Sequence, residues 1–114
     1  MGENFLITNK TRRPIPKAPF VAIKNAILGD DYNLSLVLIG NSKSKKLNLI
    51  YRNKNKPTNV LSFPISKTEG EIFLDLTKIE KELRKFDTNF ENHVKMLFIH
   101  GLLHLKGLED RKSV

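Results

Sequence analysis

The sequence contains no cysteine and no tryptophan. Without cysteine it cannot form a disulfide scaffold, a thiolate zinc finger or a thiol nucleophile, so any metal ligands must be imidazole nitrogens and oxygens. The longest uncharged apolar stretch, residues 96–105, falls well short of the ~20 residues that span a bilayer. The first residues carry an early acid and lack the apolar run of roughly 7–15 residues that marks a signal peptide. We therefore expect a cytoplasmic protein without a membrane segment.

Acidic residues are the minority charge, with 12 Asp and Glu against 20 Lys and Arg, which gives a net charge of +8. Residues 41–56 carry six basic side chains and no acid, and residues 10–17 carry four more. Such clusters are either solvated faces or a surface that follows the phosphates of a polyanion, with binding weakened by salt. Tyr51 is the only aromatic residue within the denser cluster, so the pattern favours electrostatic contact over base stacking.

The length of 114 residues and the pattern of apolar residues predict one α+β domain, residues 1–114, without repeats or linkers. We expect the helix that starts at residue 41 or 42 to turn Leu47, Ile50 and Tyr51 inward, and we expect a turn at Gly70. The predicted strands are 4–8, 34–39, 60–63 and 71–76, and the predicted helices are 20–28, 41–52, 77–86 and 89–105.

Two histidines in the last predicted helix, His100 and His104, are four residues apart and share one helix face. Neutral imidazoles at this spacing can bind one metal ion, although two unrelated histidines would show the same spacing. A zinc peptidase needs a glutamate after the first histidine as general base, and Gly101 occupies that position. Since Gly107 ends the helix, Glu109 or Asp110 could return as an oxygen ligand; the alternative is a solvated tail.

Three segments resemble the YbeY family of bacterial rRNA-maturation endoribonucleases. Residues 100–107, HGLLHLKG, resemble its signature HGxLHLxG. Residues 47–64, which contain LN, YR and PTNVLSFP, are similar to its pattern LNxxYRxxxxPTDVLSFP, and residues 70–74 resemble its GDI strand start. The resemblance covers about two thirds of the chain. It implies a small mixed β-sheet packed with helices, with a metal cleft formed by the C-terminal helix and the turn that follows it.

The resemblance also implies a set of functional residues. His100 and His104 correspond to two zinc ligands of the family, and Asp110 stands where the family has its third ligand, a histidine. Arg52 corresponds to the arginine thought to act with the metal in RNA cleavage, and His100 is the second expected catalytic residue. The expected substrate-binding residues are Arg52, Lys54, Lys56, Thr58 and Ser62.

Three functional hypotheses follow. The first is a zinc-dependent, single-strand-specific endoribonuclease with one Zn²⁺, acting on rRNA in the ribosome or a small-subunit precursor. The second is a non-catalytic RNA- or ribosome-binding protein whose metal site has decayed. The third is a metal-dependent hydrolase of another substrate, against which Gly101 argues because it removes the peptidase base. No feature of the sequence determines the oligomeric state.

Overall fold

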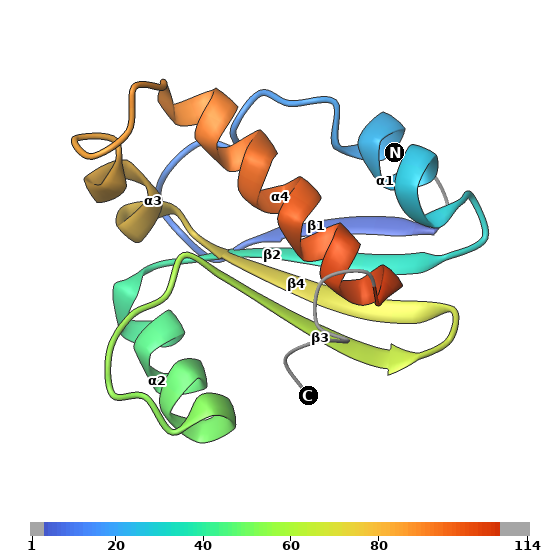
Figure 1. Cartoon of the computed structure of the whole chain (residues 1–114), viewed down its shortest axis with the longest axis horizontal. Helices are drawn as coiled ribbons and strands as arrows, with labels where there is room; N and C mark the ends of the chain where they lie inside the picture. Colours follow the sequence, from blue (N-terminus) through green and yellow to red (C-terminus); the bar gives the residue numbers. More distant parts are fainter. Residues whose placement is uncertain (1–3, 108–114) are drawn as a thin grey trace.

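The computed structural model, which describes residues 4–107, has a four-stranded mixed sheet with helices packed on both sides (Figure 1). The strand order is β1-β2-β4-β3; β2 is parallel to β1 and β4, and β3 is antiparallel to β4. The predicted α+β fold with a small mixed sheet is therefore confirmed. The elements are β1 (Phe5–Asn9), α1 (Phe20–Leu28), β2 (Asn33–Ile39), α2 (Asn41–Arg52), β3 (Val60–Ser66), β4 (Glu69–Asp75), α3 (Leu76–Glu82) and α4 (Phe90–Lys106).

The main core lies between the sheet and α4. Alternation along the strands turns every second side chain of β2 and β4 toward this helix, and those side chains are fully or almost fully buried. Phe98 of α4 is completely buried, and its ring centroid lies 5.0 Å from that of Phe20 in an edge-on arrangement and 6.2 Å from that of Phe5. One aromatic side chain thus joins α4, α1 and β1.

The ends of α4 are where the sequence predicts them. Asn89 caps the first turn, because its side chain accepts a hydrogen bond from the backbone N–H of Asn92 at 2.8 Å. Gly107 ends the helix with a φ of 86°, a left-handed conformation that glycine adopts without steric cost. The helix that bears both candidate metal ligands is thus well delimited. No helix among residues 4–107 is long and apolar enough to cross a membrane.

The orientation of α2 differs from the prediction. Its buried side chains are Ser44 and Asn48, whereas Ile50 and Tyr51 are 65% and 62% exposed. The Ser44 hydroxyl donates to Asp75 Oδ2 at 2.5 Å, and the Asn48 amide donates to the carbonyl oxygen of Lys56 at 2.8 Å. Because these polar anchors attach the helix, Ile50 and Tyr51 are left largely exposed, which the hydrophobic pattern alone could not show. Leu47, the third residue predicted to turn inward, is half-buried.

Three boundaries near β3 and β4 also differ from the prediction. β3 continues through Pro64 to Ser66, which is possible because β3 is an edge strand and its register shifts at this point. The turn lies at residues 67–68, and Gly70 is inside β4, where an added Cβ would collide with the Tyr32 hydroxyl oxygen. α3 ends at Glu82 rather than at residue 86.

Candidate nucleic-acid cleft and histidine pair

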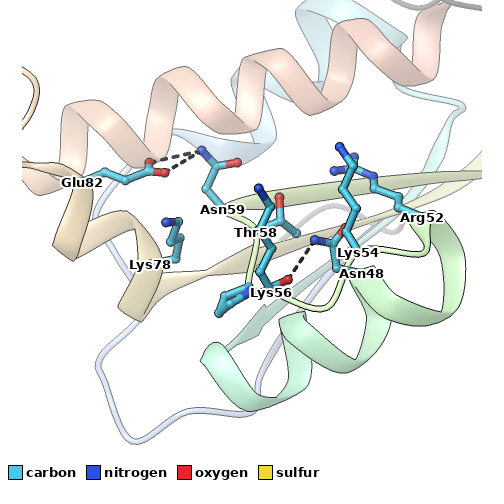
Figure 2. Close-up of a pocket in the computed structure, with 9 residues that line it drawn as sticks. Asn48, Arg52, Lys54, Lys56, Thr58, Asn59, Lys78 and Glu82 are labelled. Carbon is cyan, nitrogen blue, oxygen red and sulfur yellow. Dashed lines mark hydrogen bonds between the residues drawn. The ribbon is translucent and has the colours of Figure 1, made fainter.

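A cavity of about 290 Å³ opens between the end of α2, the loop that follows it and α3 (Figure 2). It brings together four cationic side chains and one carboxylate. We call it the basic cavity; it is lined by Asn48, Arg52, Lys54, Lys56, Pro57, Thr58, Asn59, Lys78 and Glu82. Four of the five predicted substrate-binding residues therefore lie around one cavity, and Ser62 is not among its lining residues.

Hydrogen bonds from α2 hold the loop that carries the two cavity lysines. Asn53 ends the helix in a left-handed conformation with a φ of 58°, and its backbone N–H is bonded to α2 carbonyls. The N–H of Lys54 donates to the Asn48 carbonyl oxygen at 3.2 Å, and the Asn48 side chain donates to the Lys56 carbonyl oxygen. Arg52, in the last turn of α2, is thus held beside Lys54 and Lys56 by backbone geometry.

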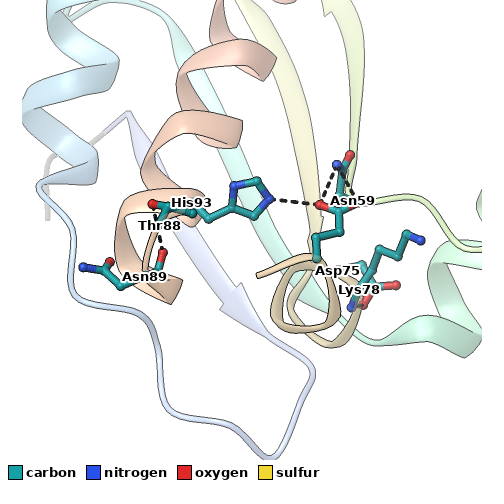
Figure 3. A network of polar contacts seen from close by, with 7 residues as sticks. Asn59, Asp75, Lys78, Thr88, Asn89 and His93 are labelled. Carbon is teal, nitrogen blue, oxygen red and sulfur yellow. Dashed lines mark hydrogen bonds and ion pairs between the residues drawn. The ribbon is translucent and has the colours of Figure 1, made fainter. Parts of the chain in front are cut away.

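The carboxylate of the basic cavity belongs to a polar network beneath it. Glu82 accepts hydrogen bonds from the Asn59 amide at 3.1 and 3.2 Å, and Glu82 Oε1 lies 2.9 Å from His93 Nε2 (Figure 3). His93 is 2% exposed and stacks on Phe86, with ring centroids 5.3 Å apart. His93 therefore anchors Glu82 and the Asn59 end of the loop from inside the protein.

Sequence reasoning missed Lys78 and Glu82. Both lie on α3, and their spacing of four residues places them on the same face of that helix. Nothing in the sequence pattern indicates that this face lies opposite the 53–59 loop, since that contact depends on how α3 packs.

His100 and His104 lie on α4, where His100 is exposed and His104 is half-buried. Their imidazoles suit one zinc ion in donor type and spacing. Residues 4–107 contain no group of three or more His, Cys, Asp or Glu side chains that could hold a metal ion. The predicted third ligand, Asp110, and its alternative, Glu109, lie outside the described residues. The pair thus fits two positions of a zinc site, and further ligands would have to come from beyond this range or from water.

One hydrogen bond connects α4, which carries both histidines, to β3, which begins beside the basic cavity. The Ser62 hydroxyl of β3 donates to the Gly101 carbonyl oxygen at 3.2 Å, directly after His100. Thr58 lines the basic cavity, and four residues of extended chain from Thr58 to Ser62 span at most ~14 Å. The basic cavity and α4, the helix that carries the histidine pair, therefore contact the same short segment of chain.

Gly101 is a residue of α4 and is buried where that helix packs against the sheet. A Cβ at this position would lie 2.9 Å from Ser62 Oγ and 3.1 Å from Ile72 Cδ1. A larger side chain, including the glutamate of a zinc peptidase, would require the side chains of Ser62 and Ile72 to shift. The structure thus adds a steric reason to the argument against peptidase chemistry.

Replacing Gly101 with alanine should destabilise the protein although alanine favours a helix. We expect the free energy of unfolding to fall by up to ~2 kcal/mol, because overpacking costs ~1–3 kcal/mol and the gain in helix propensity offsets only ~1 kcal/mol. Urea unfolding measures the change. Since Ser62 Oγ is the closest obstacle, the Gly101→Ala/Ser62→Ala double variant should lose less than the sum of the two single variants. Simple additivity would contradict this explanation.

Comparisons with known proteins show the family and the fold of the chain. The family described as Endoribonuclease YbeY matches residues 6–113. Proteins named Endoribonuclease YbeY from Chlorobium luteolum and Chlorobium chlorochromatii are each 33% identical over 111 residues, covering 91% of this chain and 81% and 71% of the relatives. A solution structure from Thermotoga maritima, 24% identical, shares the fold with a TM-score of 0.64 over 96% of this chain and 77% of its own. The chain belongs to the YbeY family.

Proposed function

We propose that this protein is a metal-dependent endoribonuclease that cleaves single-stranded RNA during rRNA maturation. Membership of a family named for endoribonuclease activity supports hydrolysis of RNA as its reaction. The observation that carries the proposal for this chain is that one short segment, residues 58–62, both lines the basic cavity and is bonded to the helix that carries the histidine pair. A phosphate backbone bound in the cavity would therefore continue toward His100 and His104.

Arg52 is the residue suited to the scissile phosphate. Its guanidinium is permanently charged, and its planar fork of N–H groups can donate to two phosphate oxygens at once. In that position it would stabilise the charge that develops on the phosphoryl oxygens in the transition state. Lys54, Lys56 and Lys78 would hold neighbouring phosphates as point charges, and Thr58 offers a hydroxyl at the same rim. Ser62 would contribute by holding α4 beside the RNA backbone bound in the basic cavity.

The proposed metal ion is zinc, held by one imidazole nitrogen each of His100 and His104 and by an oxygen of Asp110. When bound, zinc supplies a Lewis acid or lowers the pKa of a bound water to near neutrality. A carboxylate as third ligand leaves a lower net charge at the ion than a third imidazole would. The role of the chain is to present the two imidazoles from one rigid helix, with Gly101 keeping that helix against β3.

Zinc content tests this ligand set independently of activity. The wild-type protein should bind about one zinc ion, and His100→Ala should lower the zinc content of the dialysed protein by at least half. Asp110→Ala should lower it as well, whereas the neighbouring Glu109→Ala serves as the matched control and should retain it. Mass spectrometry of the metal measures the result. Equal zinc content in all variants would contradict the proposed ligands.

The second candidate function is non-catalytic binding of RNA or of a ribosomal precursor. The cationic lining of the basic cavity favours RNA binding whether or not cleavage occurs. A single-stranded RNA substrate distinguishes the two functions. Salt-dependent binding without zinc and without cleavage would support the second function, and zinc-dependent cleavage that His100→Ala abolishes would support the first.

A further inference from the structure

Three aromatic side chains that are distant in sequence form a contiguous row on the face of the sheet opposite α4. The ring centroids of Tyr51 and Phe63 are 4.8 Å apart, and those of Phe63 and Phe73 are 5.7 Å apart in an edge-on arrangement. Tyr51 belongs to α2, Phe63 to β3 and Phe73 to β4. We call these three residues the aromatic row. The sequence places only Tyr51 among basic residues, so this arrangement arises from tertiary packing.

The aromatic row lies on a face that helices only partly cover. In Figure 1, α2 lies against one end of this face, whereas α1 and α4 lie on the other side of the sheet. Tyr51 is 62% exposed, and Phe63 and Phe73 are half-buried. Leu6, which shares this face through strand alternation, is 57% exposed. The face therefore offers accessible apolar and aromatic surface.

Basic side chains border the same surface. Lys43, Leu47 and Tyr51 are spaced four residues apart and so form one stripe along α2. Two members of this stripe, Lys43 and Leu47, line a second cavity of about 410 Å³. Lys10, which follows β1, and Phe73 of β4 also line it. Glu71 is the only acidic residue lining this cavity, and residues 41–56 contain no acid at all. Aromatic rings beside positive charge match the chemistry of an unpaired nucleotide, which has a flat base and an anionic phosphate.

The aromatic row is also close to the residues proposed to bind and cleave RNA. Ser62 turns toward α4, where it is bonded to Gly101, and the next residue of β3, Phe63, turns to the opposite face against Tyr51. Arg52 follows Tyr51 directly in the chain and lines the basic cavity. Since β3 is an edge strand, an RNA strand can pass around it from one face to the other without crossing the sheet.

We propose that the exposed ring of Tyr51, supported by Phe63 and Phe73, stacks on a base of single-stranded RNA that flanks the phosphate held by Arg52. This inference rests on the proposed function, because it takes RNA as the ligand. It adds a base contact to a surface that otherwise holds only phosphates. Because every base has a π-face, such stacking tolerates many sequences, and it requires an unpaired base, which makes the aromatic row a source of single-strand preference.

Binding of a labelled RNA decamer tests the stacking contact. Fluorescence anisotropy in the presence of a metal chelator measures affinity without cleavage. We expect Tyr51→Ala to weaken binding by about 5- to 100-fold and Tyr51→Phe to bind like the wild type, because stacking needs the ring and not the hydroxyl. Ile50→Ala is the matched control, since Ile50 is the adjacent residue of α2 and is 65% exposed. It should leave affinity unchanged.

Decamers with one abasic ribose show whether the lost contact is with a base. For the wild type, one abasic position in the RNA should weaken binding to a similar extent as the Tyr51→Ala substitution does. For Tyr51→Ala, the same abasic RNA should bind as well as the intact RNA. The dependence of affinity on salt should be the same in both proteins, because no charge is removed.

Three results would overturn the inference. They are unchanged affinity of Tyr51→Ala, an abasic penalty that persists in this variant, and no binding of RNA by the wild type. The first two leave the proposed function intact if the wild-type protein cleaves RNA. Wild-type protein that neither binds nor cleaves RNA would also exclude the proposed function.

Discussion

Replacing Arg52 with alanine is expected to slow cleavage of single-stranded RNA by about 10²- to 10³-fold, the usual cost of removing one donor to transition-state charge. Arg52 lies in the last turn of α2 at the rim of the basic cavity, together with three lysines that can still attract the substrate. The loss should therefore appear mainly in kcat, with a smaller rise in KM. Single-turnover cleavage of a labelled RNA by zinc-loaded protein measures it.

Two further variants show which property of Arg52 matters. Arg52→Lys keeps the charge but loses the bidentate fork, so it should recover only a small part of the activity. Arg84→Ala removes an exposed arginine that is not among the residues lining the basic cavity and should cleave like the wild type. Equal activity of Arg52→Ala and Arg84→Ala would contradict a role of Arg52 in the reaction.

Replacing Phe98 with alanine is expected to lower the free energy of unfolding by about 3–5 kcal/mol. Phe98 is fully buried and contacts the rings of Phe20 and Phe5, so its removal leaves a cavity where α4, α1 and β1 meet. Packing between these three elements holds the histidine helix on the sheet. Chemical denaturation followed by circular dichroism measures the change.

Met96→Ala is the matched control for Phe98→Ala, because it shortens a side chain of the same helix that is 50% exposed. We expect it to change the free energy of unfolding by less than about 1 kcal/mol. Similar losses in the two variants would mean that stability does not depend on the core between α4 and the sheet.

Much of the fold could be predicted from the sequence because its patterns are local. The apolar run of β2 and the glycine that ends α4 act through neighbouring backbone atoms, and these two elements form within one residue of their predicted bounds. α2 is the exception in orientation. Its buried contacts are made by Ser44 and Asn48 with Asp75 and Lys56, and no pattern within residues 41–52 indicates those partners.

The same distinction applies to the candidate site. His100 and His104 share one helix face by spacing alone, and Arg52, Lys54, Lys56 and Thr58 are close in sequence, so local reasoning finds them. Lys78 and Glu82 come from another helix, α3. The contacts of Glu82 with Asn59 and with His93 form only because α3 and α4 pack as they do. Long-range contacts of this kind have no signature in sequence spacing.

The absence of cysteine, the excess of positive charge and the histidine spacing are determined by the sequence alone, and they limit the metal ligands to imidazole and oxygen and favour an anionic partner. Only the tertiary structure places Phe63 and Phe73 beside Tyr51, because strand alternation turns them to the face that α2 borders. Likewise, only packing shows that a side chain at position 101 would meet Ser62 and Ile72. Composition thus determines which chemistry is available, and the arrangement of the sheet and helices decides which groups meet.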